Sequence, residues 1–135
     1  MSSTDFVHLH VHSDFSLLDG ACPVEELAET AAEQGMSALA LTDHGNMFGA
    51  VSFYTAVKDA GVKPIIGYEA YMAPGPRTER GGGSAKDAAT HLTLLAMNDA
   101  GYQNLVKLAS TAYIDGFYYR PRIDKNVLSE HADGV

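Results

Sequence analysis

The chain repeats one pattern, in which a short apolar segment is followed by a helix-like stretch that a glycine ends. Apolar segments begin near residues 6, 36 and 64, and the helix-like stretches between them end at Gly35 and Gly61. Short apolar runs are typical of strands buried in a sheet, and glycine readily adopts the left-handed conformation that follows a helix. The pattern therefore predicts successive β-α units and places the chain in the α/β class.

The same pattern sets the expected boundaries along the chain. The expected strands span residues 6–12, 36–41, 64–71 and 91–96, and the expected helices span residues 23–34, 48–60, 98–112 and a last one capped by Asp124. Residues 74–90 are expected to form a flexible Gly/Pro-rich loop, because proline and a run of glycines interrupt both periodicities there. Four such units, joined by right-handed crossovers, fit an α/β barrel or an open doubly wound sheet.

Composition restricts the class of partner. Seventeen acidic and nine basic side chains give a formal net charge of -8, so the surface as a whole repels phosphate backbones. Any contact with nucleic acid is expected to be local or to use a metal ion. No apolar run approaches the roughly 20 residues that cross a bilayer, and the single cysteine, Cys22, fits a reducing compartment. We therefore predict a cytoplasmic protein without membrane contact.

Three histidines alternate with apolar residues in the first expected strand. His8, His10 and His12 are two positions apart, so a regular strand directs all three to one face. Imidazoles placed in this way can share a metal ion, but a histidine-rich strand can also line a polar interior. The triplet alone leaves both interpretations open.

The neighbouring strands add ligands at a corresponding point. His44 follows the second expected strand, and Glu69 stands towards the end of the third. Side chains at the carboxyl ends of parallel strands converge on one mouth, so His10, His12, His44 and Glu69 are expected to meet. Asp19, from the loop after the first strand, can reach this mouth and bridge two ions.

This donor set favours a catalytic metal cluster over a structural site. Divalent ions lower the pKa of a bound water to about 7 and neutralise phosphate oxygens, which suits hydrolysis of phosphate esters. Structural zinc usually has a closed, cysteine-rich shell, and the chain has one cysteine. Asp43 is expected to hold His44 through its second ring nitrogen or to cap the following helix, and His8 to lie behind the ligands or line the barrel.

The motifs, taken in order, resemble one known family. They occupy residues 6–13, 16–20, 41–49, 63–71, 91–93 and 101–105. Together they are similar to the PHP (polymerase and histidinol phosphatase) domain that opens bacterial DNA polymerase III alpha subunits. The segment Gly101-Tyr102-Gln103-Asn104-Leu105 points to this polymerase branch rather than to free-standing phosphatases.

The resemblance implies a fold and a metal site. The fold is a distorted, TIM-like (β/α)7 barrel, of which residues 1–135 would be the N-terminal part, with the C-terminal half of the barrel and the polymerase core absent. The barrel binds up to three divalent ions, with zinc favoured and manganese or magnesium as alternatives. The implied ligands are His10, His12, Asp19, His44, Glu69 and His91. His91 stands at the start of its expected strand, which geometry alone makes a less natural position for a ligand.

Two functional classes remain open at this point. The enzyme interpretation is a metal-dependent phosphoesterase or 3′–5′ exonuclease site acting on a DNA 3′ end in replication. The alternative is a non-catalytic module that stabilises the rest of the alpha subunit and docks a proofreading or other replisome subunit. Whether these 135 residues act as an enzyme alone does not follow from the sequence.

Overall fold

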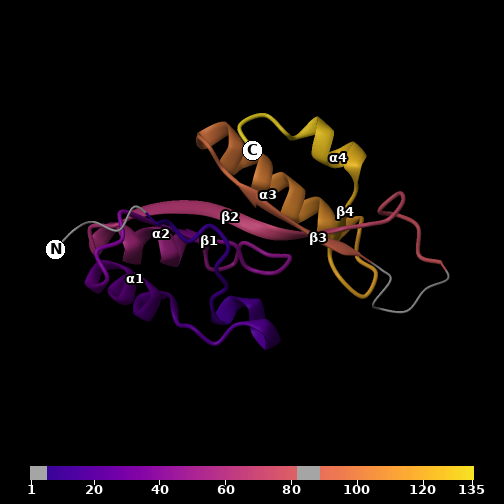
Figure 1. Cartoon of the computed structure of the whole chain (residues 1–135). Coiled ribbons are helices and arrows are strands. Elements are labelled where there is room, and N and C mark those ends of the chain that lie inside the picture. The colour runs from indigo at the N-terminus through magenta and orange to yellow at the C-terminus, as the bar shows by residue number, and fades with distance from the viewer. Residues whose placement is uncertain (1–5, 82–88) are drawn as a thin grey trace.

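The long strand β2 is the axis of the structure. In the computed structural model, which describes residues 6–81 and 89–135, β2 runs through the middle of the molecule (Figure 1). The elements in chain order are the 3₁₀ helix η1 (Asp14–Asp19), α1 (Val24–Glu33), β1 (Ala38–Leu41), α2 (Ala50–Asp59), β2 (Lys63–Met72), β3 (Thr90–Leu95), α3 (Asp99–Ile114), β4 (Arg122–Ile123) and α4 (Lys125–Glu130). None of the described helices is long and apolar enough to span a membrane.

Both edges of β2 are used. β1 pairs in parallel with its first part, β3 pairs antiparallel with its second part, and β4 pairs in parallel with its last two residues. Tyr71 pairs with His91 of β3 and with Arg122 of β4, so these two strands lie on opposite edges. Glu69 likewise pairs with Thr93 on one edge and forms an isolated parallel bridge with His44 on the other.

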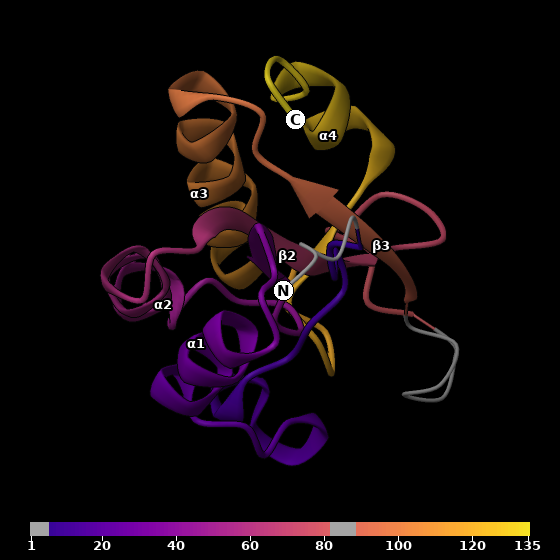
Figure 2. The same cartoon turned by 60° about the vertical axis from the view of Figure 1, so that its left-hand side comes forward.

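One face of β2 carries the core and the other carries polar groups. Ile66, Tyr68 and Ala70 alternate onto one face, where the first packs with α1 and α2 and the other two pack with α3 and α4. In Figures 1 and 2 the two helix pairs lie on different sides of the long axis of β2. Glu69 and Tyr71 consequently point to the opposite face.

Most predicted elements form, and local chemistry explains their limits. Gly35 and Gly61 follow α1 and α2 with φ of 69° and 79°, as expected for glycines that end helices. The Asn98 side chain accepts a hydrogen bond from Gly101 N, and that of Asp124 accepts one from Val127 N, so both residues cap their helices as predicted.

The prediction of four parallel strands is wrong for the fourth. β3 runs antiparallel to β2, so the link between these two strands is not the crossover to a parallel strand that was expected. The short strand β4 was not predicted, since two residues carry no periodicity. Part of the expected loop, residues 82–88, lies outside the described residues. Residues 73–81 contain no helix or strand.

The prediction of a regular first strand is also wrong. Residues 6–12 lie beside β1, where Ala40 N donates to His8 O and Thr42 N donates to Val11 O, but only one isolated bridge forms. His8 and Val11 both line a hollow next to α1, although residues three apart face opposite ways in a regular strand. The alternation therefore breaks between them.

Candidate metal centre

Glu69 is the centre of the candidate site. It lies inside β2, is only 4% exposed, and receives histidines from three different segments. Its Oε2 lies 2.5 Å from His10 Nε2, 2.7 Å from His12 Nε2 and 3.3 Å from His44 Nε2. Its Oε1 lies 2.5 Å from His91 Nδ1. The structure brings together His10, His12, His44 and Glu69, whose convergence the strand pattern predicts, and adds His91, which the family resemblance implies.

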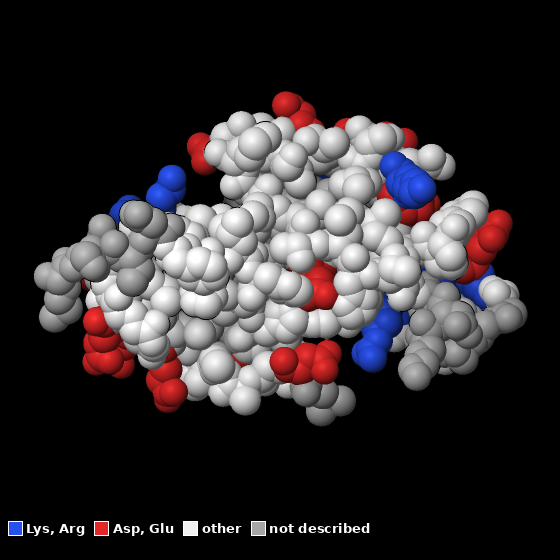
Figure 3. Space-filling view, viewed as in Figure 1, with Lys and Arg blue, Asp and Glu red and all other residues white. Residues whose placement is uncertain are grey.

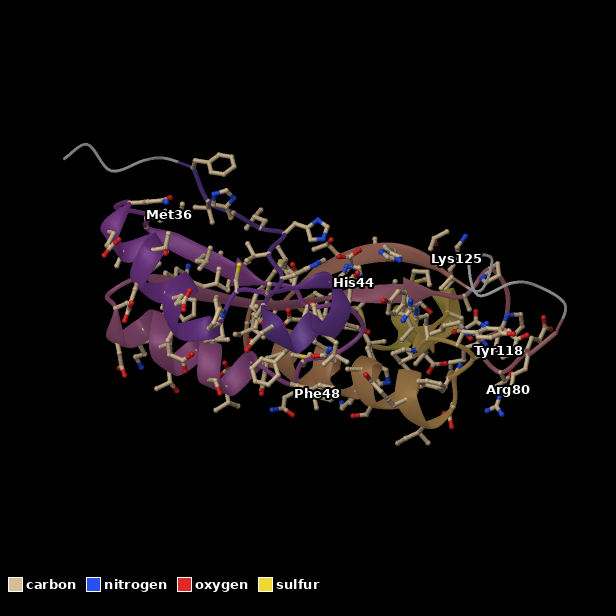
Figure 4. The ribbon with its side chains drawn as sticks, turned by 90° about the horizontal axis from the view of Figure 1, so that it is seen from below. Met36, His44, Phe48, Arg80, Tyr118 and Lys125 are labelled. Atoms are coloured by element: carbon tan, nitrogen blue, oxygen red, sulfur yellow. The ribbon has the colours of Figure 1, made fainter. Side chains whose placement is uncertain are left out.

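The five side chains form two groups that share Glu69. One group contains His10 and His12, and the other contains His44 and His91; within each, the potential ligand atoms lie within 4.8 Å of one another. The rings form a continuous row, with centroid separations of 5.1 Å (His10–His12), 4.1 Å (His12–His44) and 5.0 Å (His44–His91). Figure 4 shows His44 near the middle of the molecule.

The antiparallel direction of β3 explains how His91 reaches the centre. In a parallel strand, a residue at the strand start lies at the far end from the metal mouth. Because β3 runs the other way, its first residues lie beside the last residues of β2, and His91 pairs with Tyr71. His91 stands at the start of its strand, which is an unfavourable place for a ligand only if that strand is parallel to β2. The sequence did not reveal that β3 is antiparallel.

The electrostatics of the centre favour the ligand forms of Glu69 and His44. Burial raises the pKa of Glu69, but hydrogen bonds from His10, His12 and His91 outweigh it and lower the pKa to about 2. Burial lowers the pKa of His44, an effect that Glu69 opposes. A carboxylate with neutral imidazoles is the state that binds a divalent ion. Because nitrogen and oxygen donors are mixed and there is no thiolate among them, the set fits a divalent metal with open positions.

Asp19 stands at the edge of the centre. Its Oδ2 lies 3.8 Å from His44 Nδ1, and its side chain is 54% exposed at the end of η1. It is not a member of either ligand group found among the described residues. The structure therefore brings Asp19 to the mouth without placing it in contact with Glu69.

Asp43 organises the chain behind the ligands. It is buried, and its carboxylate accepts hydrogen bonds from Ser13 N, Ser13 Oγ and Ser16 Oγ at 2.6–2.8 Å. The expected contact with the second ring nitrogen of His44 is not formed, because that Nδ1 lies 3.1 Å from the hydroxyl of Tyr71. Asp43 instead reaches His44 through Ser16, whose Oγ accepts from His44 N.

His8 lies apart from the centre. Its ring packs edge-on against Phe6 at 4.7 Å and faces the hollow next to α1. The broken alternation of residues 6–12 separates it from His10 and His12. A role for His8 behind the ligands stays a prediction.

Tyr71 is a residue of the site that sequence reasoning missed. Besides its contact with His44, its ring lies 4.9 Å from the ring of His91. The sequence spacing could have predicted it, since Tyr71 stands two positions after Glu69 in a strand and must share its face.

Comparison with known proteins agrees with this geometry. The PHP domain family matches residues 8–135. The chain belongs to the PHP domain family. Among curated relatives of this PHP domain, DNA polymerase III subunit alpha of Borreliella burgdorferi is 52% identical over 130 residues, covering 96% of the chain and 11% of that protein. The subunit of Thermus aquaticus is 54% identical over 137 residues, with coverage of 99% and 11%. The PHP domain thus spans 11% of the length of these relatives.

Solved structures confirm the fold class. An amidohydrolase from Chromobacterium violaceum with bound sulfate matches with a TM-score of 0.58 and 25% identity, covering 78% of the PHP domain and 32% of that chain. A protein assigned provisionally as a metal-dependent phosphoesterase, from Bifidobacterium adolescentis, matches with a TM-score of 0.56 and 17% identity, covering 82% and 34%. The prediction of part of a PHP-type α/β barrel is confirmed.

Proposed function

We propose that the chain is the PHP domain of a DNA polymerase III alpha subunit and that its Glu69 centre hydrolyses phosphodiesters at a DNA 3′ end. The observation that carries the proposal is that two pairs of histidines share one buried carboxylate, that of Glu69. The identities of 52% and 54% to alpha subunits support the assignment to replication.

The ligands would be His10, His12, Asp19, His44, Glu69 and His91, with zinc favoured and manganese or magnesium as alternatives, and up to three ions in a complete domain. Bound divalent ions would supply an activated water and neutralise the oxygens of the phosphodiester. Glu69 fixes the distance between the two ligand groups because it belongs to both. Asp19 adds a negative charge at the mouth, where it can bridge ions.

Exposure gives the substrate a route to the centre. The side chains of His10 and His91 are 56% and 47% exposed, whereas that of Glu69 is 5% exposed. Solvent therefore reaches the centre from the histidine side, while β2 closes it from behind. The partners that fit this arrangement are the DNA 3′ end, the rest of the alpha subunit and other replisome subunits, in the cytoplasm.

A nuclease assay with a matched pair of variants tests the proposal. A 5′-labelled single-stranded DNA should be shortened from its 3′ end by the zinc- or manganese-loaded chain. Asp19→Asn keeps the side-chain volume and removes the charge, so the rate should fall by about 100-fold or more. Asp14→Asn, at an exposed position in the same η1 helix, is the control and should retain the wild-type rate.

The assay separates activity from folding. Metal uptake by both variants is measured in parallel. No shortening by metal-loaded wild-type chain, or equal rates for Asp19→Asn and Asp14→Asn, contradicts the proposed function.

A second candidate is the non-catalytic module, and an apolar groove favours it. A cavity of about 740 Å³ is lined by residues of α2, β2, β3 and α3 and of the link between β3 and α3. Val51, Tyr54 and Met97 in this lining are 46–76% exposed. The relatives are far longer than this chain, so the rest of the alpha subunit is the occupant that fits. A polymerase whose stability falls on Val51→Asp, while its nuclease rate is kept, would support this second function.

A further inference from the structure

A tight turn stands on the rim of the Glu69 centre. Tyr118 and Arg120 form an isolated antiparallel bridge, and Tyr119 between them has a φ of 58°. A bulky residue rarely adopts the left-handed conformation, and such outliers are concentrated at functional sites. The ring of Tyr119 is 54% exposed and lies 4.5 Å from the ring of Tyr118.

Buried contacts fix this turn against the sheet. The guanidinium of Arg122 donates to the carbonyl oxygens of Gly116, Arg77 and Glu79 at 2.8–3.0 Å and lies over the ring of Tyr118. Arg122 is itself paired with β2 through Tyr71. The turn is therefore tied to the strand that carries Glu69.

Close packing at Gly45 also connects the turn to the metal centre. A Cβ atom at Gly45, next to His44, would lie 2.7 Å from the ring of Tyr71 and 3.0 Å from Pro121. The turn and the metal centre are consequently parts of one packed unit.

Arg120 lies one aromatic ring away from the ligands. Its guanidinium carbon is 5.7 Å from the centroid of Tyr71, whose other neighbours are His44 and His91. Figure 4 shows Tyr118, from the same turn, at the end of the molecule that also carries Arg80, with His44 nearer the middle.

Arg120 differs from the neighbouring arginines in its partners. Arg77 pairs with Asp124 and Asp115, and Arg122 binds carbonyl oxygens, whereas no ion pair to Arg120 is found within residues 6–81 and 89–135. Figure 3 shows Lys and Arg at both ends of the visible face, one of which carries the loop after β2.

We propose that Tyr119 and Arg120 form a nucleotide-binding subsite next to the metal centre. Arg120 binds the phosphate adjacent to the one that is hydrolysed, and Tyr119 stacks on the base of a single strand. This subsite rests on the proposed function and explains how an acidic domain holds a DNA end. It acts in binding and positioning, not as a metal ligand.

Binding of a single-stranded oligonucleotide to the 135-residue chain tests the subsite. The probe is a fluorescent single-stranded oligonucleotide with 3′ phosphorothioate linkages that resist cleavage, followed by anisotropy with and without zinc. Arg120→Gln should weaken binding about tenfold and lower the slope of log affinity against log salt by about 0.7, the value for one phosphate contact. Arg120→Lys should restore the slope.

A second variant keeps the turn intact. Tyr119→Gly removes the ring but suits the positive φ, so the turn should fold while binding falls about tenfold. Lys107→Gln, an exposed position on α3 across the sheet, is the control and should bind like wild type.

The outcomes separate this inference from the proposed function. The subsite alone is overturned if Arg120→Gln binds the probe with wild-type affinity and salt slope, while the protein still takes up zinc and cleaves DNA. The hydrolytic function is overturned if the protein takes up no zinc and cleaves no DNA. The subsite is still supported in that case if Arg120→Gln lowers oligonucleotide binding. Equal losses for Arg120→Gln and Lys107→Gln would show that only net charge matters and would overturn the subsite.

Discussion

Two pairs of histidines meet at Glu69, and the backbone holds them differently. His44 forms a bridge with Glu69 itself, supported by a 2.8 Å hydrogen bond from Gly45 N to Glu69 O. His91 belongs to β3 and pairs with Tyr71. This pair, here called the sheet-held pair, is positioned by backbone pairing with β2, through an isolated bridge for His44 and through strand β3 for His91.

His10 and His12 form the segment-held pair. They belong to residues 6–12, which form no regular strand and contact β1 through a few hydrogen bonds on either side of His10. The side chains of His10 and His12 are 56% and 19% exposed, and those of His44 and His91 are 13% and 47% exposed, so backbone pairing and not burial distinguishes the two pairs. The sheet therefore prepares half of the site in advance, and contacts with Glu69 or an ion position the other half. This difference predicts distinct responses to substitution.

The largest loss of zinc affinity is expected from removing the carboxylate that both histidine pairs share. Glu69→Gln keeps the volume but removes the shared anion, so zinc affinity should fall by more than the roughly 10–100-fold typical of losing an outer contact. Calorimetric titration of metal-free protein measures it. Glu130→Gln, at an exposed position in α4, is the control and should bind zinc as wild type does. An affinity within tenfold of wild type for Glu69→Gln would remove Glu69 from the centre.

A smaller effect should fall mainly on the segment-held pair, since most of the Asp43 contacts are to Ser13 and Ser16 and its only link to His44 is through Ser16 Oγ. Asp43→Asn weakens the buried hydrogen bonds to Ser13 and Ser16, next to His12, and should destabilise the protein by about 1–3 kcal/mol. Urea unfolding measures the loss, and hydrogen exchange should be faster at residues 10–16 than in β2. Asp133→Asn, an exposed carboxylate, is the control. Uniformly faster exchange over both regions would contradict the division into two pairs.

The smallest effect should fall on the sheet-held pair. Tyr71→Phe removes the hydroxyl that contacts His44 Nδ1 and leaves the ring against His91. Zinc affinity should fall about tenfold, the lower end for such outer contacts, while exchange at residues 8–12 stays unchanged. Tyr54→Phe, on the exposed side of α2, is the matched control. A larger loss than for Glu69→Gln would show that Tyr71 itself is central.

The sequence predicts the site better than it predicts the path of the chain. His44 and Glu69 follow buried apolar runs, so their convergence is set by parallel strands, and the structure brings them together. The resemblance to PHP domains supplied His91, because strand direction has no signature in local periodicity. Only the pairing with β2 decides it.

The errors share a physical cause. Alternation in residues 6–12 predicts a strand, and residues 10–12 keep it, since Val11 packs into the apolar core near α1 while His10 and His12 contact Glu69. The break lies before them, because His8 lines the same hollow as Val11, and local pattern does not show which side tertiary packing gives to His8. Asp43 was predicted to hold the His44 ring for the same reason, since sequence proximity does not show that Tyr71 fills that position.

The most direct test of a divalent-metal centre at Glu69 is anomalous diffraction at the zinc edge from crystals of the zinc-loaded chain. Two peaks should be found, one among His10, His12 and Glu69 and one among His44, Glu69 and His91. The first should weaken before the second as zinc is diluted, because the sheet holds only the second pair in advance. Peaks at surface histidines with none beside Glu69 would contradict the account.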